Sequence, residues 1–191
     1  MYKRQIVYGR TGSDIAREYK IPKHQGQGWI DWWFNTFKEA HSFLLECREM
    51  PIKEWSIVSP FGNRKRPKVI THKTKHNIQN QASNFLPQNI ASNLILDATA
   101  ILVERHMKNW SLAHQGWEIV NLIHDETLFQ IDDDESVQIA LFNEFAQLIE
   151  ELAWEHNLTE VPFICEAKVG THWGSMIEQT WQFKLQHTYG E

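Results

Sequence analysis

Three consecutive ionisable residues, His124, Asp125 and Glu126, stand between two apolar, β-branched runs at 117–123 and 127–131. The runs predict two strands, so the three residues would form the tip of a tight hairpin. Glycine, asparagine or serine suits such a tip better, and adjacent carboxylates repel each other unless a cation lies near them. Carboxylate oxygens suit Mg²⁺, and a rigid hairpin tip could hold them in place. A solvated turn is the alternative, and the motif alone leaves both open.

Two side-chain amides, Asn84 and Gln88, are four residues apart at the start of a helix predicted over 84–107. This spacing places them on one helical face. An amide donor suits the minor groove of DNA, where purine N3 and pyrimidine O2 offer an acceptor in similar places for every correct base pair. Such contacts test the shape of a pair without reading its sequence. The alternative is that Asn84 caps the helix and Gln88 is exposed.

Basic residues are concentrated in one stretch of the chain. The 191 residues have a formal net charge of −5, which by itself argues mildly against a nucleic-acid partner. Residues 62–76 nevertheless contain no acid and six basic side chains, namely Arg64, Lys65, Arg66, Lys68, Lys73 and Lys75. This strip could contact phosphates, or it could be a solvated loop.

Hydrophobic periodicity predicts a fold in which helices and strands are segregated. We expect a short helix over 13–19 capped by Ser13 or Asp14, and a longer helix over 27–50 with a break near His41. A strand at 55–58, the helix over 84–107, the hairpin, a helix over 137–154 and a strand at 161–169 follow in that order. This order predicts an α+β protein, with an antiparallel sheet covered by helices on one face.

The two cysteines, Cys47 and Cys165, are far apart in sequence and form no metal-binding pair. This pattern is typical of a reducing compartment. The N-terminus is too polar for a signal peptide, and no apolar run is long enough to cross a membrane. We therefore expect a cytoplasmic protein without a membrane partner.

In their order and spacing these elements resemble family A DNA polymerases, the bacterial DNA polymerase I and phage replicase type, and a phage-type member is expected. The resemblance runs from about residue 6 to residue 176. Five motifs carry it: Ile6-Val7-Tyr8-Gly9 for the end of the fingers-helix motif, 62–67 for a Gly-Arg-Arg-rich turn, 84–88 for the Asn-x3-Gln helix, 124–126 for motif C, and 170–173 for the closing tail.

The resemblance implies a role for each matching residue. Asp125 would hold magnesium and Glu126 would be a supporting carboxylate near two Mg²⁺ ions, while His124 would contact the primer terminus. The remaining roles concern primer-template DNA and the incoming dNTP: Asn84 and Gln88 in the minor groove of the nascent duplex, Arg64 and Arg66 on backbone phosphates, and Tyr8 with Gly9 at the nucleotide and templating-base pocket.

The resemblance also implies a division of the chain. Residues 6–78 would be part of a fingers subdomain and 79–176 the C-terminal part of a palm subdomain. Residues 1–5 do not fit the family and read as a non-native prefix, and the tail at 177–191 matches no family element.

The chain departs from the family at several positions. Arg4 stands where the family has an aromatic residue, Asn80 stands where it has an arginine, and the fingers lysine would precede residue 1. The first metal-binding motif, Asp-Tyr-Ser-x2-Glu, has no copy, and Asp31 and Asp97 lie in predicted helices. The resemblance therefore implies a fragment that lacks an N-terminal polymerase portion and is inactive alone. A non-catalytic duplex DNA-binding module, a magnesium-dependent nuclease and the C-terminal subunit of a split polymerase are the alternatives.

Overall fold

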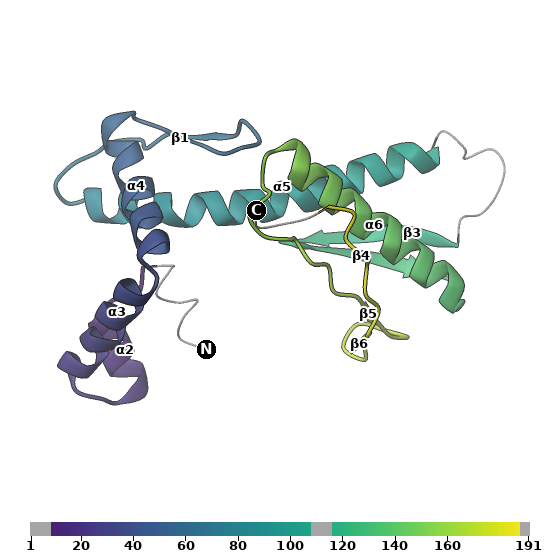
Figure 1. The fold of residues 1–191 in the computed structure, drawn as a ribbon, viewed down its shortest axis with the longest axis horizontal. Helices are drawn as coiled ribbons and strands as arrows, with labels where there is room; N and C mark the ends of the chain where they lie inside the picture. Colours follow the sequence, from purple (N-terminus) through teal and green to yellow (C-terminus); the bar gives the residue numbers. More distant parts are fainter. Residues whose placement is uncertain (1–8, 108–115, 188–191) are drawn as a thin grey trace. The chain divides into compact units, whose positions relative to one another are not determined.

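The computed structural model describes residues 9–107 and 116–187 and confirms the α+β class. The chain divides into two compact units, residues 1–90 and residues 91–191, and α5 runs through both (Figure 1). The helices are α2 (Gly12–Tyr19), α3 (Lys23–Thr36), α4 (Lys38–Lys53), α5 (Lys75–Met107) and α6 (Glu135–Glu155). The strands form three antiparallel pairs: β1 (Ile57–Val58) with β2 (Arg64–Lys65), β3 (Trp117–Ile123) with β4 (Glu126–Ile131), and β5 (Lys168–Val169) with β6 (Ile177–Glu178).

The first helix, α2, begins one residue earlier than predicted and has a different cap. The Asp14 backbone N–H donates to the Thr11 hydroxyl at 3.3 Å, and the Thr11 N–H donates to the Asp14 carboxylate at 3.2 Å. This reciprocal pair is a capping box, in which the cap stands three residues before the acid. The predicted caps, Ser13 and Asp14, are therefore wrong, because both already lie inside the helix.

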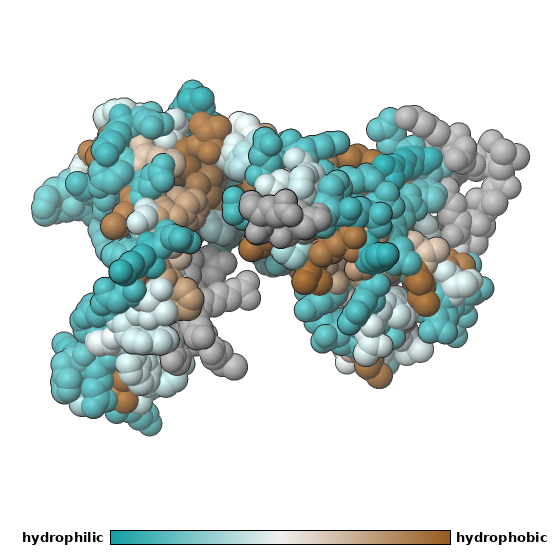
Figure 2. All heavy atoms as spheres, in the orientation of Figure 1, coloured by the Kyte–Doolittle hydropathy of each residue, from teal (hydrophilic) through white to brown (hydrophobic). Residues whose placement is uncertain are grey.

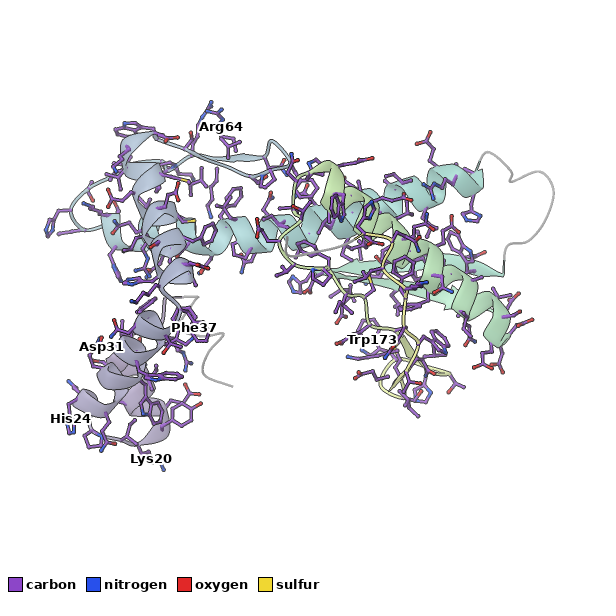
Figure 3. All side chains as sticks on the ribbon, viewed as in Figure 1. Lys20, His24, Asp31, Phe37, Arg64 and Trp173 are labelled. Carbon is purple, nitrogen blue, oxygen red and sulfur yellow. The ribbon has the colours of Figure 1, made fainter. Side chains whose placement is uncertain are left out.

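The long helix predicted over 27–50 is two helices. The break falls at Phe37, four residues before His41, where φ of −110° and ψ of 68° interrupt the helical backbone (Figure 3). Helix α3 lies so close to α2 that a Cβ at Gly12 would stand 2.7 Å from the Gln27 Cα. Only glycine permits this approach.

Two hydrophobic clusters stabilise the first unit. Ile15, Ile30, Trp33 and Leu44 form one of them, which joins α2, α3 and α4. The other contains Cys47, Ile57, Ala82 and Leu86, and it packs α4 and the β1–β2 ribbon on the first part of α5. Hydrophobic side chains gather where these three elements meet, whereas α2 and α3 present mainly hydrophilic and intermediate residues in this view (Figure 2).

Helix α5 begins at Lys75, nine residues before its predicted start at Asn84. Residues 75–83 have no regular apolar spacing, which hid this part of the helix from the sequence. A turn at Thr71 and Thr74 precedes the helix, in which the Thr71 N–H donates to the Thr74 hydroxyl at 2.8 Å and the Thr74 N–H donates to the Thr71 hydroxyl at 3.2 Å. The predicted C-terminal end at Met107 agrees with the structure.

The second unit places both of its helices on one face of the β3–β4 hairpin, as predicted. The Phe129 ring of β4 lies 5.8 Å from the Phe145 ring of α6, and Trp117 of β3 lies 5.1 Å from His106 of α5. Trp117 also packs edge-on against Phe129 at 5.6 Å, so the two contacts belong to the same hairpin face. The α5 residues Leu94, Ala98 and Leu102 and eight residues of α6 are buried.

The strand predicted at 161–169 is wrong over most of its length. Only Lys168 and Val169 pair, and their partners are Glu178 and Ile177. These partners belong to the tail at 177–191, for which no helix or strand is predicted from the sequence. Residues 161–166 run without strand pairing, so apolar and β-branched composition there did not suffice to form a sheet.

The C-terminal tail packs along α6. Trp181 lies 5.9 Å from Phe142, and further along both segments the His187 ring stacks on Trp154 at 4.4 Å. Glu150, only 1% exposed, accepts hydrogen bonds from the backbone N–H groups of Gln186 at 2.8 Å and His187 at 3.0 Å. The tail up to residue 187 is therefore part of the packed second unit.

Within the described ranges no helix is both long enough and apolar enough to span a bilayer. Cys47 and Cys165 are both free thiols, and burial raises the pKa of each to about 11. The cytoplasmic location stays a prediction.

The buried carboxylate of Glu150 makes the second unit sensitive to acid. Burial alone raises the pKa of Glu150, but the N–H donors of Gln186 and His187 outweigh burial and lower it below the usual value. A lowered pKa in the folded state adds stability that is complete above the unfolded-state pKa and is lost as pH falls through the folded-state value. We expect Glu150→Gln to cost about 1–3 kcal/mol near neutral pH, because its amide meets backbone donors with one oxygen only.

Denaturant unfolding of wild type and variant at pH 7 and pH 3 measures this effect. The gap in unfolding free energy should shrink at the lower pH, because the unfolded wild-type chain binds a proton there more readily than the folded carboxylate does. Glu155→Gln, an exposed acid in the same helix, is the matched control and should change stability by less than about 0.5 kcal/mol. An equal gap at both pH values would contradict the role of the charge.

Candidate functional site

The turn at the hairpin tip contains fewer residues than the sequence predicts. Ile123 pairs with Glu126, so the turn contains only His124 and Asp125, and Glu126 is the first residue of β4. His124 has φ of 56°, a left-handed conformation that is uncommon outside glycine, asparagine and aspartate but is accessible to histidine. A two-residue turn held by paired strands on both sides is a short, rigid platform for Asp125.

All three residues of the motif are exposed. Asp125 and Glu126 provide oxygen ligands of the type that magnesium prefers. No group of three or more His, Cys, Asp or Glu residues within 9–107 and 116–187 lies close enough to hold a metal ion. The two carboxylates are thus the right type of ligand for magnesium, but they are too few to form a complete site by themselves.

Asn84 and Gln88 lie well inside α5 and do not begin it. The capping alternative for Asn84 is wrong, because nine helical residues precede it. Gln88 is exposed and Asn84 is half-buried. The Asn84 Oδ1 atom is shielded from solvent and has no hydrogen-bond partner in the part of the chain that the structure describes. A buried polar atom without a partner is rare in folded proteins, and because this acceptor faces the interior, only the Asn84 Nδ2 donor could serve a minor-groove contact.

The β1–β2 ribbon brings the basic strip onto the same part of α5. The Lys65 Nζ lies 5.7 Å from the centre of the Phe85 ring, and the Asn63 side chain donates to Asn89 at 3.5 Å. Phe85 and Asn89 each follow one of the two amide residues in α5. The structure therefore brings the ribbon and the amide pair together within the first unit.

Arg64 and Arg66 are both exposed on this ribbon. The Arg64 Nη1 donates to the Ser56 hydroxyl at 3.4 Å, and its side chain lies on the side of the ribbon away from α5 (Figure 3). Arg66 directly follows β2. Exposed guanidinium groups on a short ribbon are well suited to contact phosphates.

Tyr8 lies outside the described residues, and Gly9 lies against α5. Gly9 has φ of 87°, and a Cβ there would stand 3.1 Å from the Asn80 Oδ1. Asn80 accepts a hydrogen bond from the Arg48 Nη2 at 3.4 Å. Sequence reasoning missed Arg48, because it lies in α4, 32 residues away from Asn80.

The chain matches a known protein family and resembles several known proteins. Residues 3–175 match the family described as DNA polymerase family A. The chain is 24% identical over 174 residues to DNA polymerase I of Treponema pallidum (strain Nichols), a match that covers 88% of this chain and 16% of that protein. It is 26% identical over 136 residues to DNA polymerase I A, chloroplastic/mitochondrial, of Arabidopsis thaliana, which covers 71% of this chain and 12% of that protein.

A solved structure shares the fold. The POL domain of Pol1 from M. smegmatis, in complex with DNA primer-template and dNTP, matches with a TM-score of 0.60 and 20% identity over 79% of this chain and 25% of that one. The chain belongs to DNA polymerase family A. It spans less than a fifth of the length of these two curated relatives.

The turn at His124 allows a test of the hairpin geometry. His124→Gly should leave stability unchanged or raise it slightly, because glycine adopts positive φ without steric cost. His124→Val should lower stability by about 1–2 kcal/mol, because a β-branched side chain is strained in the left-handed region. Thermal unfolding of both variants measures the difference, and equal stability of the two would argue against the turn as described.

Proposed function

We propose that this chain contributes to a DNA-directed DNA polymerase, which transfers a nucleotide from a dNTP to the 3′-hydroxyl of a primer. The observation that carries the proposal is the exposed Asp125-Glu126 pair at a two-residue hairpin tip, in a chain that matches DNA polymerase family A over residues 3–175. The relative solved with primer-template DNA and dNTP supports the same substrates for this chain.

Each candidate residue has a role in this proposal. Asp125 binds magnesium directly, Glu126 supports the metal site, and His124 contacts the primer terminus. When bound, a pair of magnesium ions stabilises the charge on the attacking and leaving oxygens. The other residues hold the DNA and the nucleotide: Asn84 and Gln88 in the minor groove, Arg64 and Arg66 on backbone phosphates, Tyr8 and Gly9 at the nucleotide and templating-base pocket.

The proposal requires a second carboxylate that the described residues do not provide. Asp31 is exposed in α3, where it accepts a hydrogen bond from Gln27 at 2.9 Å, and Asp97 lies in α5. Neither belongs to a cluster of acids that could hold a metal ion. We therefore propose that a further polymerase portion supplies the other aspartate, either in a longer chain or as a separate subunit. Residues 6–78 then act as partial fingers and residues 79–176 as the C-terminal part of the palm.

Primer extension is the first test of this proposal. The purified 191-residue chain, given primer-template DNA, dNTPs and Mg²⁺, should add no nucleotide above background, since one acidic hairpin tip cannot hold two divalent ions. Extension products resolved on a denaturing gel provide the measurement. Magnesium-dependent extension by this chain would refute the proposal that its active centre is incomplete.

The second test uses a polymerase assembled from this chain and a portion with the first metal-binding motif. Asp125→Ala should abolish nucleotide incorporation and leave duplex binding within about twofold, because the carboxylate acts on the reacting atoms and not on DNA affinity. Asp133→Ala, an exposed acid just before α6, is the control and should leave incorporation unchanged. Loss of duplex binding with normal residual chemistry would remove Asp125 from the metal site.

A non-catalytic DNA-binding module is the second candidate function. One observation favours it: the basic ribbon and the amide pair lie together in the first unit, and this arrangement does not require the acidic hairpin. Such a module would bind duplex DNA equally well with and without Mg²⁺, and Asp125→Ala would have no effect in any assembly. Under the polymerase proposal, nucleotide incorporation should depend both on Mg²⁺ and on Asp125.

A further inference from the structure

Arg48 of α4 lacks an anionic partner in the described part of the chain. Its side chain is half-buried, and its Nε atom is shielded from solvent and makes no hydrogen bond there. None of the ion pairs within the described ranges includes it, and the nearby acid Glu49 pairs with Lys53 at 3.8 Å. Among the described residues its side chain makes one hydrogen bond, at 3.4 Å from Nη2 to the neutral Asn80 side chain.

This arrangement is costly unless an anion completes it. Removing a guanidinium from water is unfavourable, and a neutral amide acceptor offsets only a small part of that cost. A structural arginine in such a place is usually paired with a carboxylate. The Nη1 group of Arg48 is not shielded in this way, and it can instead donate to the oxygens of a phosphate.

The neighbours of Arg48 indicate which phosphate it binds. Asn80, Asn84 and Gln88 are spaced by four residues, so they form one row along α5. The row extends about 12 Å, the rise of three to four base pairs. Asn80 stands at one end of the row, where it contacts both Arg48 and Gly9. Arg48 thus adds a cation to the end of the row of amides that is nearest the proposed nucleotide pocket.

We propose that Arg48 binds a backbone phosphate of the DNA strand that lies along this row, and that Asn80 positions its guanidinium. This inference rests on the proposed DNA-binding function of Asn84 and Gln88. The row then becomes a continuous contact, with a phosphate at Arg48 and base edges at the amides.

Binding of fluorescein-labelled primer-template DNA to the 191-residue chain, followed by anisotropy at several salt concentrations, tests the inference. Arg48→Ala should weaken binding about tenfold or more and reduce the slope of log K against log salt by about 0.9, the loss of one phosphate contact. Arg48→Lys should retain most of the slope, because it keeps the charge. Asn80→Ala should weaken binding less than Arg48→Ala and leave the slope nearly unchanged, since it removes orientation and no charge.

Arg17→Ala is the matched control for net charge. Arg17 lies in the same unit, its side chain is 82% exposed, and its loss should change the affinity less than twofold. A purely structural Arg48 would give a lower melting temperature in Arg48→Ala with an unchanged salt slope, and that result would overturn the inference. Weaker binding of free dNTP with unchanged DNA binding would overturn it as well, because it would assign the site to the triphosphate.

Arg64→Ala separates this inference from the proposed function. If Arg64→Ala weakens DNA binding and Arg48→Ala does not, the inference about Arg48 is wrong, whereas the proposal that the β1–β2 ribbon binds DNA is retained. If the chain has no measurable affinity for primer-template DNA in any salt condition, both the inference and the proposed DNA-binding surface are wrong.

Discussion

The packing of α5 is the interaction on which the rest of the structure depends. This helix has 33 residues, about 50 Å of rise, and each compact unit packs on its own part of it. In the first unit Ala82 and Leu86 hold α4 and the β1–β2 ribbon, and in the second unit Leu94, Ala98 and Leu102 lie in the core. Because the buried faces fix how the helix is rotated, they also fix which side chains remain available. For this reason Asn80 and Asn84 are half-buried, and Gln88 is exposed.

Acidic and basic side chains are concentrated in different places in this chain. The acidic hairpin tip is exposed and its carboxylates are not matched by cations in the described residues, which suits an external metal ion. The basic groups are Arg64 and Arg66 on the ribbon and Arg48 beside Asn80, all without a carboxylate partner among the ion pairs of the described residues. An overall negative charge therefore does not prevent phosphate binding, because the field that a strand of DNA meets is set locally.

Sequence reasoning succeeded where one pattern determined the local structure. Alternating apolar residues located β3 and β4 to within a residue or two, and motif order indicated the family, which the match over residues 3–175 confirms. It failed where structure depended on distant partners. The first residues of α5 have no apolar periodicity that would predict a helix. Only two residues of the strand predicted at 161–169 are paired, and their partners come from the tail. Arg48 contacts Asn80, which lies 32 residues away in the sequence. The phage-type assignment, the subdomain boundaries and the site roles stay predictions.

The hydrogen bonds that Glu150 accepts from Gln186 and His187 have a consequence for the order in which the chain acquires its structure. Its two backbone donors lie 36 and 37 residues downstream, so a growing chain contains the acid well before it contains the groups that satisfy it. Until residue 187 leaves the ribosome, α6 carries a carboxylate that cannot be buried, and Phe142 and Trp154 lack their aromatic partners. During synthesis the second unit should therefore remain loosely packed, with apolar surface open to chaperones, until the segment up to residue 187 is available.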